Sequence, residues 1–165
     1  MKQSKILVVE DDVDIQQILS VFLEHSDFEV RTASDGQEAI NIIPNFCPHL
    51  IVLDLVMRPV SGWEVLRWLQ ANRQASSTEA YAAEGPIPVL VLTALTHIAE
   101  QIHGFEAGAV EYITKPTQPS KIVERISTIL SLSVEQRAML QRKRMEEQRD
   151  VLERIYAPQP DEFLY

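Results

Sequence analysis

Five short apolar runs alternate along this chain with five stretches of helical periodicity, and this alternation constrains the fold more than any other feature. The runs are rich in β-branched and aromatic residues and are too short for helices, which favours strands. They cover residues 6–9, 28–32, 50–53, 88–92 and 110–113. Strict alternation of strands and helices predicts right-handed crossovers and a parallel sheet covered on both faces. The sequence therefore predicts an α/β fold, a doubly wound (βα)5 domain.

Local signals predict where the helices begin and end. Pro44 is expected to end the second helical stripe, because proline lacks the N–H that continues a helix. Pro119 suits the first turn of the fifth helix. After Leu132, Ser133 and Gln136 have the spacing of a capping box, which predicts a new helix. The expected organisation is a domain over residues 1–132, a helical extension over 133–156 that serves dimerisation or as a linker, and a tail over 157–165.

Composition excludes several classes of protein. Fifteen Lys and Arg against twenty-four Asp and Glu give a net charge of −9, which repels a phosphate backbone and argues against direct DNA binding. No run approaches the roughly 20 apolar residues of a membrane span. The single cysteine, Cys47, permits no internal disulfide and fits a reducing compartment, so we expect a cytoplasmic protein that does not contact membranes.

The expected site lies beyond the carboxyl ends of the strands, where ligands bind in open parallel sheets. Asp54 closes an apolar strand, and a lone buried carboxylate costs several kcal/mol unless it is paired or bound to a metal. The other polar residues at these ends are Glu10, Asp11, Asp12, Thr93, Thr114 and Lys115. Clustered carboxylates repel one another and therefore need a cation. A hard site with few oxygen ligands suits Mg²⁺.

Four motifs in register carry a resemblance to a known family. They are the acidic pair Glu10-Asp11, the aspartate of "LIVLDLVM", the "LTA" that ends at Ala94 and the "YITKP" that ends at Pro116. Together they resemble the receiver domain of two-component response regulators, of the chemotaxis-receiver kind, over about residues 4–131. The resemblance implies a flavodoxin-like five-stranded sheet and a signalling protein that is no enzyme beyond its own phosphorylation and dephosphorylation.

The resemblance also implies a role for each matching residue. Asp54 would accept a phosphoryl group from a sensor histidine kinase or a phosphotransfer protein, with Lys115 and Thr93 contacting that group. Thr93 and Tyr112 would form the switch. The implied Mg²⁺ ligands are Glu10, Asp11, Asp54 and the backbone carbonyl of Val56. Two departures from the family pattern, the displaced Pro59 and Thr117 after "KP", remove no reacting group.

Several residues have structural interpretations. We interpret Asp12 as a helix N-cap, Trp63 and Trp68 as half-buried packing beside the third helix, and Cys47 as a small buried or half-buried side chain. The segment 73–88 is longer than the corresponding link in typical receivers, and its role is open. It leads to the amino end of a strand, opposite the carboxylates, and so is not expected to take part in the chemistry.

Two other classes of function compete with a phosphorylated switch. Haloacid-dehalogenase-type phosphatases also use an aspartate at a strand end, but they require a second Asp two residues later, where this chain has Val56. A pseudo-receiver, a binding module that never takes phosphate, would not need the intact acids, hydroxyl and ammonium. The chain could also be the receiver and linker of a larger response regulator, and the sequence names neither the kinase, the stimulus nor the target.

The helical extension predicts a homodimer. Seven residues fall at alternating steps of four and three, the seam of a heptad repeat, but two of them are Gln and one is Ala, so the apolar seam is thin. This stripe consists of Val134, Ala138, Gln141, Met145, Gln148, Leu152 and Ile155. We expect so long and so charged a helix to need a partner for its stripe rather than its own domain. The alternative is a solvated linker to an output domain. That domain would have to lie outside this sequence, because the roughly 30 residues after Leu132 are too few to complete a DNA-binding module.

Overall fold

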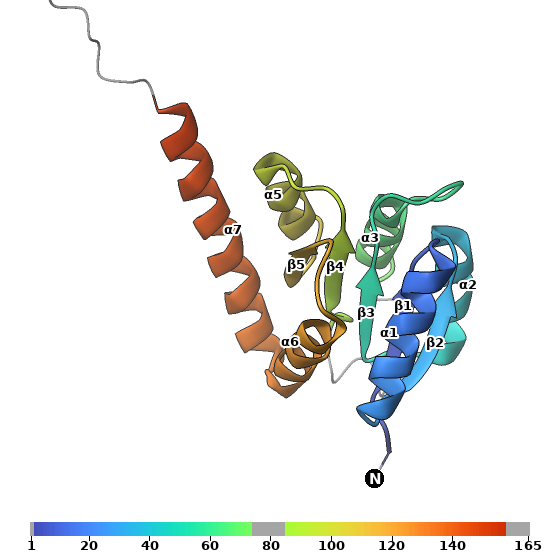
Figure 1. Ribbon diagram of the computed structural model, residues 1–165. Helices are drawn as coiled ribbons and strands as arrows, with labels where there is room; N and C mark the ends of the chain where they lie inside the picture. Colours follow the sequence, from blue (N-terminus) through green and yellow to red (C-terminus); the bar gives the residue numbers. More distant parts are fainter. Residues whose placement is uncertain (1, 74–84, 158–165) are drawn as a thin grey trace, which may run out of the picture.

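The computed structural model describes residues 2–73 and 85–157, and its centre is a five-stranded parallel sheet (Figure 1). The strand order is β2-β1-β3-β4-β5, so β2 and β5 are the outer strands. The strands are β1 (Lys5–Val9), β2 (Glu29–Ala33), β3 (Leu50–Leu53), β4 (Val89–Thr93) and β5 (Glu111–Thr114). Their positions agree with the five apolar runs, and the order reverses direction between β1 and β3. This is the doubly wound fold that the sequence predicts.

Helices cover both faces of the sheet, as two separate apolar clusters show. The first cluster joins the sheet to α2 (Gly36–Phe46), α3 (Gly62–Ala71) and α5 (Ile98–Glu106). The second joins it to α1 (Val13–His25) and α6 (Pro119–Ser131). Strands β3 and β4 are buried along their whole length, because both of their faces are covered. The polar ends of these strands are therefore the places where charged groups meet the core.

The helix ends confirm most of the local predictions. The Asp12 side chain caps α1 by accepting hydrogen bonds from Asp14 N and Ile15 N. Pro119 stands in the first turn of α6. Pro44, however, does not end α2, which continues to Phe46, and that prediction is wrong. A proline this close to the carboxyl end breaks only one backbone bond, and the left-handed Cys47 then ends the helix.

The last helix, α7 (Val134–Tyr156), begins at the predicted capping box of Ser133 and Gln136. It runs beside α5, β5 and α6 of its own domain (Figure 1). Five of the seven stripe residues are half-buried there: Val134, Gln141, Met145, Gln148 and Leu152. The expectation that the stripe needs a partner outside its own domain is therefore not met. Among the described residues, no helix is long and apolar enough to cross a membrane.

Candidate phosphoacceptor and metal site

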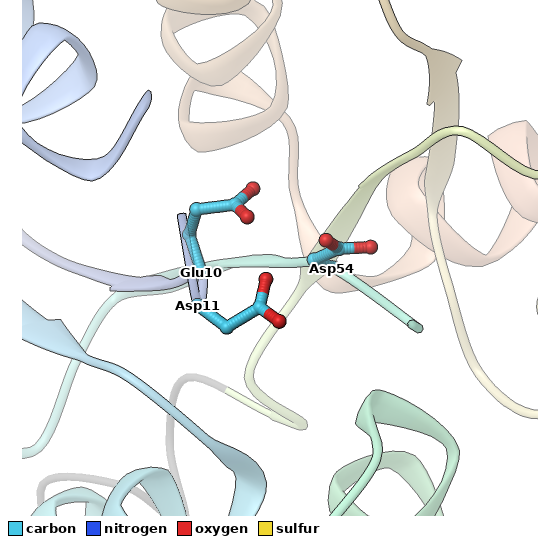
Figure 2. Close-up of side chains that lie close together, drawn as sticks. All are labelled: Glu10, Asp11 and Asp54. Carbon is cyan, nitrogen blue, oxygen red and sulfur yellow. The ribbon is translucent and has the colours of Figure 1, made fainter. Parts of the chain in front are cut away.

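Three carboxylates converge at the carboxyl end of the sheet, as the sequence predicts (Figure 2). Glu10 and Asp11 follow β1, and Asp54 follows the adjacent strand β3. One carboxylate oxygen of each lies within 4.8 Å of the others. Glu10 and Asp54 are only 2% and 5% exposed, whereas Asp11 is exposed. The cluster thus has a buried floor and an open side facing solvent.

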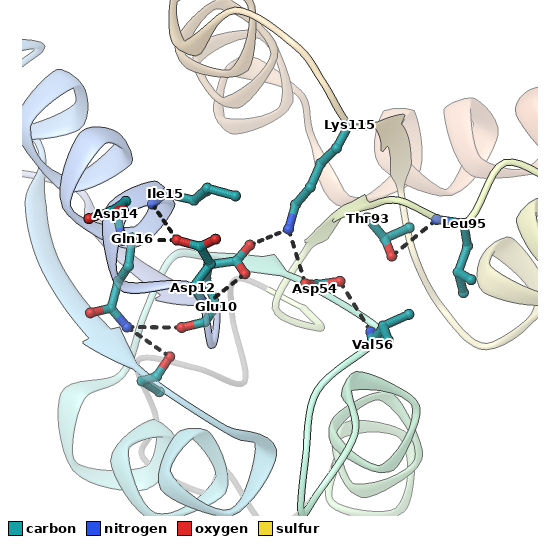
Figure 3. A network of polar contacts seen from close by, with 11 residues as sticks. Glu10, Asp12, Asp14, Ile15, Gln16, Asp54, Val56, Thr93, Leu95 and Lys115 are labelled. Atoms are coloured by element: carbon teal, nitrogen blue, oxygen red, sulfur yellow. Dashed lines mark hydrogen bonds and ion pairs between the residues drawn. The ribbon is translucent and has the colours of Figure 1, made fainter.

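Lys115 reaches the two buried carboxylates from the end of β5 (Figure 3). Its Nζ lies 2.5 Å from Glu10 Oε2 and 3.0 Å from Asp54 Oδ2. The other oxygen of Asp54, Oδ1, accepts a hydrogen bond from Val56 N at 3.1 Å. Both oxygens of Asp54 are therefore held in place by donors, which satisfy the buried carboxylate.

The protonation of the site reflects its burial. Burial raises the pKa of Glu10 from 4.5 to about 7, and the charge of Asp54 acts in the same direction. Hydrogen bonds from Lys115 and from Asp12 N oppose that rise. Burial lowers the pKa of Lys115, but its bonds to Glu10 and Asp54 outweigh burial and hold this pKa above its ordinary value. Lys115 therefore carries a positive charge at neutral pH, which the two acids need.

The site fits a small divalent cation. Its donors are hard oxygens, one of its three acids is exposed, and its ligand oxygens lie close enough together to share one ion. Val56 is 55% exposed, and its backbone N–H donates to Asp54 Oδ1, so its backbone lies beside the cluster. The described residues contain an acidic cluster of the kind that is typical of the Mg²⁺ site of receivers.

The two predicted switch residues lie on the other side of Asp54. Thr93 is fully buried at the end of β4, and its Oγ1 accepts a hydrogen bond from Leu95 N at 3.5 Å. The Tyr112 hydroxyl donates to Leu95 O at 3.1 Å, and the side chain is 9% exposed. Thr93 and Tyr112 are thus connected through the backbone of Leu95. Both residues lie near the site, and the motion that the sequence analysis expects of them stays a prediction.

The backbone around Asp54 leaves no room for adjustment. A Cβ on Gly62, the first residue of α3, would lie 2.1 Å from Asp54 O and 2.8 Å from Leu55 Cα. Only glycine allows α3 to approach the end of β3 so closely. On the other flank, Gln16 of α1 donates from Nε2 to Glu10 O at 3.0 Å. These contacts hold the backbones of Asp54 and Glu10 in place at the edge of the sheet.

Sequence reasoning overlooked a third buried acid among the described residues, Glu111 of β5. It is 6% exposed, and two arginines approach its Oε2: Arg144 Nη2 of α7 at 3.3 Å and Arg125 Nη1 of α6 at 3.6 Å. An acid inside an apolar strand run was the available signal, as it was for Asp54. The two interpretations of tryptophan and cysteine hold, since Trp63, Trp68 and Cys47 are half-buried. Most of the 73–88 segment lies outside the described residues.

Comparison with known proteins agrees with this geometry. Residues 6–127 match the model of the response regulator receiver domain. The chain is 35% identical over 130 residues to the probable transcriptional regulator ycf27 of Porphyridium aerugineum, covering 79% of this chain and 49% of that protein. It is 36% identical over 129 residues to the alkaline phosphatase synthesis transcriptional regulatory protein PhoP of Bacillus subtilis, covering 78% and 49%.

A solved structure shows the same fold. The chemotaxis response regulator CheY4 of Vibrio cholerae superposes with a TM-score of 0.66 at 26% identity, covering 78% of this chain and 99% of that one. The match to the family model spans both the acidic cluster and Lys115. The chain therefore belongs to the response regulator receiver domain family of two-component signalling, and it carries an additional helix at its carboxyl end. It spans about half the length of the curated relatives it matches.

Proposed function

We propose that this protein is a response regulator whose Asp54 accepts a phosphoryl group from the phosphohistidine of a sensor kinase or a phosphotransfer protein. The observation that carries the proposal is the position of Asp54. Its carboxylate is buried at a strand end, held by Lys115 and Val56 N, and lies within 4.8 Å of two further acids. A nucleophile, a counter-charge and a cation site at one point are the parts that phosphoryl transfer requires.

The transfer needs little chemistry beyond positioning. One Asp54 oxygen forms a bond to phosphorus while the P–N bond of phosphohistidine breaks. The electron pair of that bond stays with the imidazole, which takes up a proton. Lys115, already 3.0 Å from Asp54 Oδ2, would contact a phosphoryl oxygen, and Thr93 would donate its hydroxyl to the same group. Tyr112, connected to Thr93 through Leu95, would report the change at the surface.

Mg²⁺ is the proposed cofactor. Glu10, Asp11, Asp54 and the Val56 carbonyl would hold it, with Glu10 acting through water more readily than directly because Lys115 already contacts its side chain. When bound, the ion neutralises charge on the phosphoryl oxygens. Lys115 must then share or leave the carboxylates, so the ammonium group and the cation compete for Glu10 and Asp54.

Labelling with a small acyl-phosphate donor tests the function directly. With Mg²⁺ present, the protein should become phosphorylated, and Asp54→Ala should abolish the label. Asp12→Ala is the matched control, because Asp12 caps α1 and is not among the proposed ligands. If Asp54→Ala is labelled to the wild-type extent, the assignment is wrong. If the wild-type protein takes no label from donor or kinase, the chain is a pseudo-receiver instead.

We further propose that phosphorylation changes how the chain associates with a second copy, so that the output is a homodimer. The heptad spacing of the α7 stripe in the sequence motivates this proposal. Because five of its seven residues pack against their own domain, pairing would require α7 to move, and light scattering with and without a phosphoryl mimic tests it. A monomer under both conditions would contradict it. A second candidate is the receiver and linker of a longer regulator, which the half-length coverage of transcriptional regulators favours. The mass of the polypeptide isolated from its natural source, measured after denaturation, separates the two: it is near that of this chain in the first case and about twice as large in the second.

A further inference from the structure

Helix α7 is held against its own domain by polar contacts from three of its side chains. Gln141 Nε2 donates to Phe105 O at 2.6 Å, Arg149 Nη2 lies 2.7 Å from Glu106 Oε1, and Arg144 Nη2 lies 3.3 Å from Glu111 Oε2. We call the surface formed by Phe105, Glu106 and Glu111 the docking face. It belongs to α5 and β5, on the side of the sheet where α7 runs (Figure 1).

We infer that α7 is a detachable cover of the docking face, and that the cover must leave before the protein can dimerise through its helical stripe. The inference rests on the proposed phosphorylation-dependent dimer and adds how it is controlled. The unphosphorylated state would keep α7 docked on its own chain. Phosphorylation of Asp54 would shift the balance toward release, so that α7 and the docking face become available to a second copy.

The same residues of α7 cannot serve both arrangements. Met145 packs against the cluster beneath α5, and Leu140 against the cluster beneath α6. Gln141 and Met145 also lie at the centre of the heptad stripe. A helix that turns these side chains toward its own domain has no seam left to offer another helix. Docked and paired states of α7 are therefore mutually exclusive.

The contact between α7 and its domain is specific but weakly built. None of the α7 residues is buried. The Nε atoms of Arg137 and Arg144 are buried without a hydrogen-bond partner among the described residues. Unsatisfied donors cost free energy, and little apolar area compensates for them. A modest change in the residue that holds such a helix in place can therefore displace it, whereas a helix packed into the core would stay.

Glu111 is the residue that holds α7 in place, because a buried carboxylate needs cationic or hydrogen-bonding partners and Arg144 of α7 is one of them. Losing Arg144 would leave Arg125, at 3.6 Å, as the remaining cationic partner of Glu111 among the described residues. Glu111 also connects the cover to the phosphorylation site, since its Oε1 accepts from Tyr112 N at 3.2 Å. Tyr112 leads through Leu95 O to Thr93 beside the site. A turn of Thr93 toward a phosphoryl group would disturb Leu95, then Tyr112, and then the position of Glu111.

Distance measurements between two spin labels test the inference on the full chain. The labels would stand at Ala99→Cys on α5 and Met139→Cys on α7, both exposed positions, in a Cys47→Ser background. The unphosphorylated protein should give one narrow distance distribution at concentrations where it is monomeric. Saturation with beryllium fluoride as a phosphoryl mimic should make that distribution longer and broader. An unchanged distribution in protein whose Asp54 accepts phosphate would overturn the proposed coupling.

Two substitutions separate release from phosphorylation. Arg144→Glu and, on the other partner, Glu111→Gln should each lengthen the distance and strengthen dimerisation by about tenfold or more without any mimic. Arg142→Glu makes the same charge change at an exposed position of α7 and should leave both unchanged. Because these measurements need no phosphate, they stand even if Asp54 takes none. If α7 stays docked in both variants, or leaves without strengthening the dimer, the inference is wrong.

Discussion

The ammonium group of Lys115 lies 3.0 Å from the carboxylate of Asp54, and the same nitrogen lies 2.5 Å from Glu10. One positive charge therefore serves two buried acids that belong to different strands. A divalent cation bound at this cluster has to compete with an ammonium group that is already in contact with its ligands. The first two predictions follow from this shared ammonium group.

Removing the ammonium group should strengthen Mg²⁺ binding. In Lys115→Met the cation faces no competitor for Glu10 and Asp54 and no repelling charge, so we expect affinity to rise by about tenfold or more at pH 8. Calorimetric titration measures it. Phosphoryl labelling should fall in the same variant, because nothing neutralises the transferred group. Lys121→Met, an equal charge change at an exposed position of α6, is the control, and weaker Mg²⁺ binding in Lys115→Met would contradict the prediction.

The raised pKa of Glu10 predicts how metal-free stability depends on pH. The folded protein keeps a proton on Glu10 up to about pH 7, whereas the unfolded chain releases it near 4.5. In that window the folded state binds more protons, so the free energy of unfolding should decrease as pH rises. The contribution is at most about 3 kcal/mol. Urea unfolding in a chelator at pH 5 and pH 8 measures it, and Glu10→Gln should remove this component. Equal slopes in both proteins would refute it.

The side chains of Val56 and Leu95, which we expect to flank the path of an attacking water, predict a long-lived phosphoryl group. Val56 is exposed and Leu95 is half-buried, and neither can orient or activate a water molecule. Replacing them together, Val56→Asn with Leu95→Glu, should speed loss of the label by about tenfold. The Tyr112 bond is to the backbone of Leu95, so the double variant retains it. Val56→Leu with Leu95→Met is the apolar control, and unchanged or slower decay in the polar variant would oppose the idea.

Gly62→Ala should be among the most damaging single substitutions in the domain. Its Cβ would meet Asp54 O at 2.1 Å, and a backbone atom cannot turn away as a flexible side chain can. We expect a loss of more than about 3 kcal/mol in the free energy of unfolding. Gly104→Ala, whose Cβ would lie 3.1 Å from the Tyr112 ring, should cost less. Comparable losses in both variants, measured by chemical denaturation, would show that the contact can relax.

Much of the fold and the site was predictable from the sequence because both depend on periodic or local signals. Alternating apolar runs indicate the strands, and right-handed crossovers between them indicate a parallel sheet covered on both faces, but they do not fix the strand order, which the structure supplies. That geometry brings Glu10, Asp54 and Lys115 together from distant parts of the chain. Asp12 and Ser133 could be interpreted as caps because capping depends on residues within one turn.

The position of α7 could not be predicted in the same way. A heptad stripe records that one face of a helix is covered, but it does not say whether the cover is a second copy or the same chain. The decisive residue is Glu111, whose meaning depends on Arg144, 33 positions later. The prediction that Pro44 ends its helix was wrong for a simpler reason. The cost of proline in a helix depends on how many turns follow it, and here the helix was already near its end.

The two outer strands of the sheet are protected in different ways. On β2, Glu29 and Arg31 are exposed, and their charges oppose pairing with a strand from another molecule. On β5, Glu111 is buried and bonded to a residue of α7, so protection on that side depends on a helix that is itself weakly held. Any condition that frees α7 should therefore also make the protein more prone to aggregate, and it should do so at the β5 side rather than the β2 side.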